Sequence, residues 1–153
     1  MELPIYIIDF NPDTDEMLVN SLVDEPAHRH YFIAQAKKHF NFSVNEVKRE
    51  VTGVVIAANQ PIYYYSDEVP ECYIVFTADN IKKIALKYFT EKRYNLIDIN
   101  HDFEIRDNDA VVAETYFAAK ENAFNVDEGS WIITYKINND ALWQLVKSGK
   151  LKG

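Results

Sequence analysis

Cysteine is almost absent from this 153-residue sequence, since Cys72 is the only one and no disulfide can form within the chain. Its scarcity is typical of a protein that works in a reducing cytoplasm. Glycine and proline are also rare, with four and five residues, so few disordered stretches are expected. No apolar run approaches the roughly 20 residues that span a bilayer. The N-terminus, Met1-Glu2-Leu3-Pro4, has neither the basic nor the apolar part of a secretion signal.

Basic residues are in the minority, with 16 Lys and Arg against 24 Asp and Glu, for a net charge of −8. A surface with this excess of negative charge repels the phosphates of nucleic acids. The strongest basic cluster, Lys37-Lys38-His39, is too short to reverse that repulsion. Direct binding of nucleic acid is therefore not expected.

Apolar residues make up 48% of the chain, which is enough for a single domain, residues 1–153, with a sizeable core. Apolar residues recur at helical spacing between Thr77 and Arg93 and predict one long helix there, with a buried stripe that contains Ile81, Ile84, Ala85, Tyr88 and Phe89. A shorter helix is expected over residues 140–148, with Ala141, Leu142, Leu145 and Val146 on its buried face. Runs of β-forming residues predict strands at 5–10, 48–57, 72–76, 110–119 and 131–137, within a total of five to seven. The expected fold class is α+β: a small, mostly antiparallel β-barrel or curled sheet flanked by one long and one short helix.

His101 is the first candidate for chemistry, because it stands where the apolar alternation of residues 96–99 meets a polar loop. A histidine at a strand end is held firmly yet stays reachable, as a general base must be. Asp102 and Glu114 are the carboxylates that could orient its ring, although Asp102 is poorly placed if the strand continues through it. Glu114 lies in an otherwise apolar strand, on the same face as Val112 and Tyr116, and a buried carboxylate needs a partner. The alternative is that His101 is an ordinary loop residue and Glu114 points to solvent.

Two possible metal sites fit their patterns poorly. Acidic and amide side chains alternate from Asp9 to Asp15 as in a calcium loop, but Thr14 stands where glycine is needed and Asn20 where a bidentate Glu belongs. His28 and His30 would share a face of a strand, yet no fourth fixed ligand is evident. We therefore expect no metal.

No residue of this sequence has a recognisable nucleophile context. Cys72 lies among strand-forming apolar residues and is expected to be a small buried hydrophobe. None of the serines stands in a Gly-x-Ser-x-Gly elbow. The five serines are Ser21, Ser43, Ser66, Ser130 and Ser148.

Four segments together resemble the phage prohead protease family, the capsid-maturation serine proteases related in fold to herpesvirus assemblin. The nearest branch is that of serine proteases from tailed phages of Gram-positive bacteria. The segments are Ser21-Leu22-Val23-Asp24-Glu25-Pro26-Ala27, Lys48 to Ile56, Asn100-His101-Asp102 with Val111-Val112-Ala113-Glu114, and Gly129 to Gly153. The resemblance implies a small β-barrel flanked by helices, and a role for His101 as general base.

The same resemblance implies that the serine nucleophile follows the terminal helix, in a Phe-Ser or similar pair beyond Gly153. The chain as given is therefore expected to lack the C-terminal segment that carries the nucleophile and to be inactive as a peptidase. Glu114 is the expected third member of the triad. No cofactor is implied.

The resemblance predicts a serine endopeptidase that cleaves scaffold and major capsid proteins during procapsid maturation, in the bacterial host cytoplasm and inside the procapsid. A non-catalytic assembly or scaffold-binding protein that retains the protease fold is the alternative.

Overall fold

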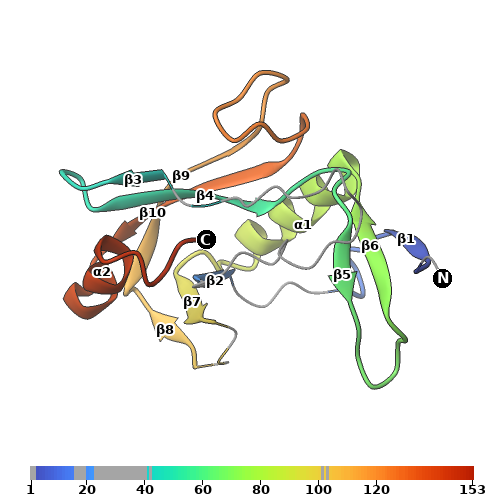
Figure 1. The fold of residues 1–153 in the computed structure, drawn as a ribbon, viewed down its shortest axis with the longest axis horizontal. Coiled ribbons are helices and arrows are strands. Elements are labelled where there is room, and N and C mark those ends of the chain that lie inside the picture. Colours follow the sequence, from blue (N-terminus) through green and yellow to red (C-terminus); the bar gives the residue numbers. More distant parts are fainter. Residues whose placement is uncertain (1–2, 16–19, 23–40, 42, 101, 103) are drawn as a thin grey trace.

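A computed structural model describes residues 3–15, 20–22, 41, 43–100, 102 and 104–153 of the chain. These residues form two helices and ten strands, arranged in three sheets (Figure 1). The strands are β1 (Ile5–Ile8), β2 (Asn20–Leu22), β3 (Ser43–Asn45), β4 (Glu50–Ile56), β5 (Ile62–Tyr64), β6 (Cys72–Phe76), β7 (Leu96–Ile99), β8 (Arg106–Asp107), β9 (Ala110–Phe117) and β10 (Trp131–Ile137). The helices are α1 (Ala78–Thr90) and α2 (Asp140–Lys147), and neither is long and apolar enough to cross a membrane.

The largest sheet is antiparallel, with strand order β3-β4-β10-β9. Its strand β10 is covered on both faces. Trp131, Ile133 and Tyr135 lie in the main hydrophobic cluster, which also includes residues of α1, α2 and β7. Ile132 points to the opposite face, as expected for its neighbour in a strand, and packs against residues of the loop that follows β9. The sheet therefore separates the main core from a smaller second cluster.

Helix α1 begins where the sequence predicts and buries the predicted stripe. Thr77 is its N-cap, and the Thr77 hydroxyl accepts a hydrogen bond from the backbone N–H of Asn80 at 3.3 Å. The apolar stripe faces the main core, with Phe89 half-buried at its end. The fully buried members are Ile81, Ile84, Ala85 and Tyr88.

Helix α2 packs against the same core beside β10, near the C-terminus (Figure 1). Its N-cap is Asn139, and Gly149 follows the helix with a φ of 75°, a left-handed conformation that glycine adopts at little cost. The predicted buried face is partly wrong, because Ala141 is exposed and Trp143 is buried in its place. The Arg49 guanidinium lies over the Trp143 ring, 5.6 Å from its centroid, in a cation–π contact.

Two three-stranded sheets, β1-β6-β5 and β2-β7-β8, complete the described fold. Most strand pairs are antiparallel, but β1 pairs with β6, and β2 with β7, in parallel. The α+β class is confirmed. The barrel is not, since none of the described sheets closes on itself, and four strands are fewer than the roughly five of a small closed barrel. The strand β5 lies outside the ranges in which strands were predicted from the sequence.

Candidate active site

Strand β7 leads directly into the segment that contains His101 in the sequence. Ile97, with no exposed surface, anchors β7 in the main core. The backbone N–H of Asn100 donates to the carbonyl of Leu22 at 3.0 Å, and that of Asp102 donates to the carbonyl of Ile99 at 3.1 Å. The chain therefore reverses between Ile99 and Asp102 in a four-residue turn. His101 itself lies outside the described residues.

Asn100 supplies the backbone conformation that this reversal needs. Its φ is 53°, in the left-handed region that asparagine tolerates better than most residues. The sequence Asn-His-Asp thus begins with a residue suited to a sharp turn. This local chemistry, together with the buried strand before it, fixes the backbone on the N-terminal side of position 101.

Asp102 fixes the other side of the turn. Its carboxylate oxygens accept hydrogen bonds from the Arg106 guanidinium at 2.8 and 3.2 Å, and one of them also accepts the backbone N–H of Glu104 at 3.0 Å. The Arg106 hydrogen bond, supported by the backbone N–H groups of Glu104 and Ile99, lowers the pKa of Asp102 to about 2. Asp102 is thus engaged with Arg106 and its own loop, and braces the turn.

Glu114 lies on β9, where the pairing with β10 is irregular. Glu114 pairs with Thr134 and Val112 with Tyr135, so Ala113 is an extra residue in the strand. Adjacent residues of β10 face opposite sides of the sheet, which puts Glu114 and Val112 on opposite faces. The expectation that these two residues share a face is wrong for this reason. Tyr135 belongs to the main core with Ile97 of β7, so Glu114 points to the face away from β7.

The side chain of Glu114 is exposed, which removes the argument that a buried carboxylate at this position needs a partner. Glu114 therefore points to solvent, as the alternative interpretation of the sequence stated. Its pairing with His101 stays a prediction, because the imidazole is outside the described residues.

Asp98, on β7, is a carboxylate that the sequence analysis did not select. Its exposed fraction is 2%, and it is the one buried carboxylate among the residues that the structure describes. The signal was present in the sequence, because Asp98 interrupts an apolar run, Leu96-Ile97-Asp98-Ile99, three positions before His101. An acidic residue in the middle of a short apolar strand is as unusual as Glu114 in its longer one.

Three of the serines have clear structural roles. The Ser130 hydroxyl is fully buried, accepts the backbone N–H of Ala58 at 2.8 Å and donates to the Asp127 carbonyl at 2.7 Å. The Ser66 hydroxyl accepts backbone N–H groups in the β5–β6 turn. Ser148 is the C-cap of α2, as expected for a serine at a helix end. Cys72 is buried at 1% exposure, which confirms its interpretation as a small hydrophobe.

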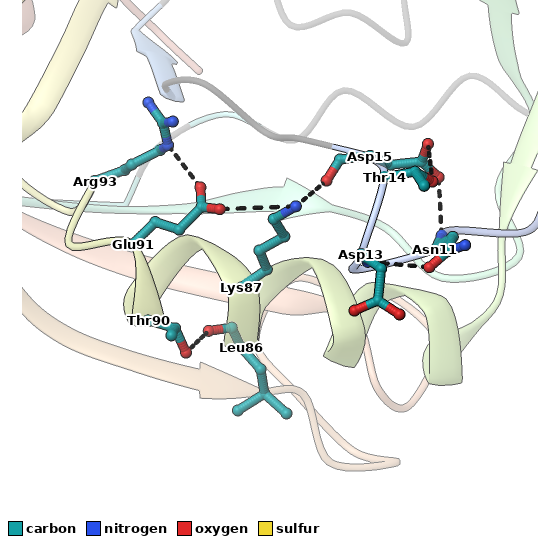
Figure 2. A network of polar contacts seen from close by, with 9 residues as sticks. All are labelled: Asn11, Asp13, Thr14, Asp15, Leu86, Lys87, Thr90, Glu91 and Arg93. Carbon is teal, nitrogen blue, oxygen red and sulfur yellow. Dashed lines mark hydrogen bonds and ion pairs between the residues drawn. The ribbon is translucent and has the colours of Figure 1, made fainter.

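The polar side chains of the acidic turn after β1 form hydrogen bonds with the backbone of the same turn (Figure 2). The Asp15 carboxylate accepts the N–H of Asn11 at 2.8 Å, and the Asn11 side-chain oxygen accepts the N–H of Asp13 at 3.0 Å. Lys87, on α1, donates its ammonium to the carbonyl of Asp15 and lies 3.7 Å from Glu91. The geometry gives the turn a structural role, as a loop closed on itself and docked on the helix.

The second possible metal site falls outside the description. His28, His30 and the neighbouring His39 all lie in the segment 23–40, which the structure does not describe. Among the described residues, no group of three or more His, Cys, Asp or Glu side chains is arranged to hold a metal ion.

Residues 39–153 match the model of a family described as "Putative phage serine protease XkdF". The matched residues include the turn after β7, the candidate carboxylates Asp102 and Glu114, and the terminal helix. The match defines the chain as a protease-like α+β domain related to phage serine proteases. The chain belongs to this family. No curated protein and no solved structure matches the chain.

The family match confirms the resemblance inferred from the sequence, with one segment outside it. The motif from Ser21 to Ala27 precedes the matched residues, so its contribution is not tested. The segments around His101, around Glu114 and from Gly129 onward lie within the match.

Proposed function

We propose that this chain is the endopeptidase domain of a phage prohead protease, which cleaves segments of scaffold and capsid proteins during procapsid maturation. The observation that carries the proposal is the family match over residues 39–153, which includes a firmly held turn around the position of His101. The site of action is the assembling procapsid in the cytoplasm of the bacterial host. The partners are the phage scaffold protein and the major capsid protein.

The proposed chemistry is acyl transfer. His101 accepts the proton of a serine hydroxyl as the serine oxygen attacks the scissile carbonyl carbon. The imidazolium then donates that proton to the leaving amine as the peptide bond breaks. In the second half, His101 activates a water molecule that hydrolyses the acyl-enzyme, and the serine recovers its proton. Glu114 is the carboxylate predicted from the sequence to orient the ring, and backbone N–H groups are expected to stabilise the oxyanion.

The turn after β7 suits such a base, because catalysis requires a side chain held within a narrow range of positions. Asn100 is tied to β2 by its N–H, and Asp102 is tied to Arg106 at 2.8 Å. Both neighbours of His101 in the sequence are thus fixed by contacts that do not involve the imidazole.

The nucleophile is expected from the family pattern in residues that follow Gly153. Three of the serines within the chain are less suited to the role, since Ser66, Ser130 and Ser148 are engaged with the backbone around them. We therefore expect the 153-residue chain alone to show no peptidase activity.

The proposal is tested by a cleavage assay of the natural protein, including any residues beyond Gly153, on purified scaffold protein. Cleavage is expected, and His101→Ala should reduce it by a factor of at least about 10³, as the loss of a triad member does. Glu104→Gln is the matched control, because this carboxylate lies in the same loop and is 80% exposed. The control should cleave at the wild-type rate.

Two results would count against the protease function. Cleavage that survives His101→Ala would remove His101 from the mechanism, and cleavage lost in Ser148→Ala would show that the nucleophile is a different serine. Binding of the scaffold protein without any cleavage by the natural protein would instead favour the non-catalytic assembly role.

A further inference from the structure

The strand β1 exposes large apolar side chains on both of its faces. Ile5, Tyr6 and Ile7 are consecutive in the sequence and have exposed fractions of 54%, 54% and 70%. Because side chains alternate along a strand, Ile5 and Ile7 point to one face of the sheet β1-β6-β5 and Tyr6 points to the other. Three consecutive apolar residues that are more than half exposed are unusual in a folded domain unless they have a function.

Contacts at both ends hold this strand in place, so the exposure of its side chains is a feature of the fold. At the start of β1, the backbone N–H of Tyr73 on β6 donates to the carbonyl of Pro4 at 2.8 Å. Beyond its end, the N–H of Phe10 donates to the side-chain oxygen of Asn80 on α1 at 2.8 Å. The Phe10 ring lies in the main hydrophobic cluster. These contacts fix β1 beside β6 and leave its three apolar side chains uncovered.

Strand β1 also lies at an edge of its sheet. Among the described strands it pairs only with β6, in parallel, and Figure 1 shows it on the outer side of β6, with β5 on the other side. The N–H and C=O groups that point away from β6 thus have no partner strand in the described part of the chain. A partner that lay on one face of the sheet would cover only Tyr6, or only Ile5 and Ile7. A strand added at the edge would contact all three side chains.

The charged side chains of this sheet and its connections are all acidic. The segments 3–15 and 57–79 contain no Lys or Arg, and none of the ion pairs between described residues involves either segment. Lys87 of α1 donates to the backbone carbonyl of Asp15 and not to its carboxylate. This surface therefore favours a positively charged partner. The acidic residues are Asp9, Asp13, Asp15, Asp67, Glu68, Glu71 and Asp79.

Two of these carboxylates lie at the two ends of β1. Asp9 directly follows the last residue of the strand and is exposed. The parallel register with β6, continued beyond the strand, places Glu71 beside Leu3, just before β1 begins. Glu71 is exposed, and its carboxylate accepts a hydrogen bond from the Tyr63 hydroxyl at 2.6 Å. At about 3.3 Å per residue over residues 3–9, about 20 Å of extended chain separates the two acidic groups.

We propose that β1 is the docking edge for an extended segment of a partner protein, with Lys or Arg at each end of the segment and apolar residues between. The segment adds a fourth strand to the sheet β1-β6-β5, and its backbone bonds to the outer edge of β1. Its apolar side chains cover Ile5, Tyr6 and Ile7, and its basic ends reach Asp9 and Glu71. The turn after β7 belongs to a different sheet, so this proposal does not depend on peptidase activity.

The test measures binding of a fluorescent synthetic peptide, Lys-Val-Thr-Val-Thr-Val-Lys, to the purified protein by fluorescence anisotropy. Binding is expected, and it should weaken as added salt screens the charges. The same peptide with Glu in place of both Lys should bind at least about tenfold more weakly, because like charges then face each other. Two further forms carry N-methyl groups on alternate residues, each in one of the two phases. Because a strand bonds to its neighbour through alternate N–H groups, only one of these forms should lose affinity, by at least about tenfold.

A substitution in β1 tests the location of the site. Ile7→Lys should weaken binding of the Lys peptide at least about tenfold, because it removes an apolar contact and adds a charge of the same sign as the peptide. Val47→Lys is the matched control, because it makes the same change of charge at a side chain that is 97% exposed, in the turn between β3 and β4. The control should change the affinity by less than about twofold. If Ile7→Lys does not fold, as judged by circular dichroism, the N-methylated peptides decide, since they need no variant.

Three results would overturn the proposal. They are equal affinities of the two N-methylated peptides, equal affinities of Ile7→Lys and Val47→Lys for the Lys peptide, and binding of the Glu peptide as tight as that of the Lys peptide. Absence of peptide binding, together with a dimer in sedimentation that Ile7→Lys dissociates, would refute the basic partner and assign the edge to a second copy of the chain. None of these measurements needs turnover, so their outcome is independent of whether the protein cleaves scaffold protein.

Discussion

Ile97→Ala is the substitution that tests whether β7, and with it the turn around position 101, is anchored as described. Ile97 has no exposed surface and belongs to the same hydrophobic cluster as Leu22 of β2 and Tyr135 of β10. Truncation of a buried isoleucine to alanine costs about 2–5 kcal/mol, with the larger values where the surroundings cannot collapse into the cavity. The cluster that contains Ile97 includes residues of more than one sheet and of both helices, which cannot all collapse into the cavity, so we expect about 3–4 kcal/mol.

Equilibrium unfolding in urea measures this loss. With an m-value of about 2 kcal/mol/M, the midpoint of unfolding should fall by about 1.5–2 M. Ile105→Ala is the matched control, because the same atoms are removed from a side chain that is 51% exposed, in the loop that follows the turn. The control should cost less than about 1 kcal/mol. Equal midpoints for the two variants would refute the burial of Ile97 and the docking of β7 on the core.

Two further predictions concern glycine and the acidic turn. Gly129→Ala should destabilise the protein by more than about 2 kcal/mol, because Gly129 has a φ of 86° and a new Cβ would lie 2.5 Å from the Cβ of Ala78. Gly149→Ala, with a φ of 75° but open space around it, should cost only about 1 kcal/mol, and equal thermal midpoints for the two would contradict the close approach. The pKa of Asp102 is lowered to about 2, so its contribution to stability is present above about pH 4, the unfolded value, and is lost as the pH falls towards 2. Arg106→Gln should remove this part of the acid dependence in unfolding curves measured between pH 5 and 2, and an unchanged curve would contradict the ion pair.

The helices could be predicted from the sequence because their signals are local. The 3.6-residue spacing of Ile81, Ile84 and Tyr88 marks the buried face of α1 within the chain itself, and Thr77 supplies the cap. The long strands β4, β9 and β10 were predictable for the same reason, from runs of β-branched and aromatic residues.

The short strands β2, β3, β5 and β8 could not be predicted, because two or three residues contain too little periodicity. Of these, β2 pairs in parallel with β7, far along the chain, whereas β3, β5 and β8 pair with the strand next to them in the sequence. The pairings of β1 with β6 and of β4 with β10 also join distant segments, so the arrangement of the strands in open sheets could not be predicted from local patterns.

Some features of the candidate site could likewise be predicted from the sequence, and others could not. The turn at Asn100 could be predicted from the preference of asparagine for a left-handed backbone. The face of Glu114 could not, because one extra residue at Ala113 reverses the alternation and has no signature in the sequence. Asp98 could have been found, since it is an acidic residue inside an apolar strand and close to the histidine.

The central claim, a serine protease whose general base is His101, is tested most directly by covalent labelling of the natural protein with a fluorophosphonate, followed by mapping of the modified residue by mass spectrometry. The account predicts one labelled serine, in residues that follow Gly153, and a rate of labelling that falls at least about 100-fold in His101→Ala, because the hydroxyl is activated only by its base. Glu104→Gln should label at the wild-type rate. No labelled serine, labelling at Ser43 or Ser148, or labelling that is unchanged in His101→Ala would contradict the account.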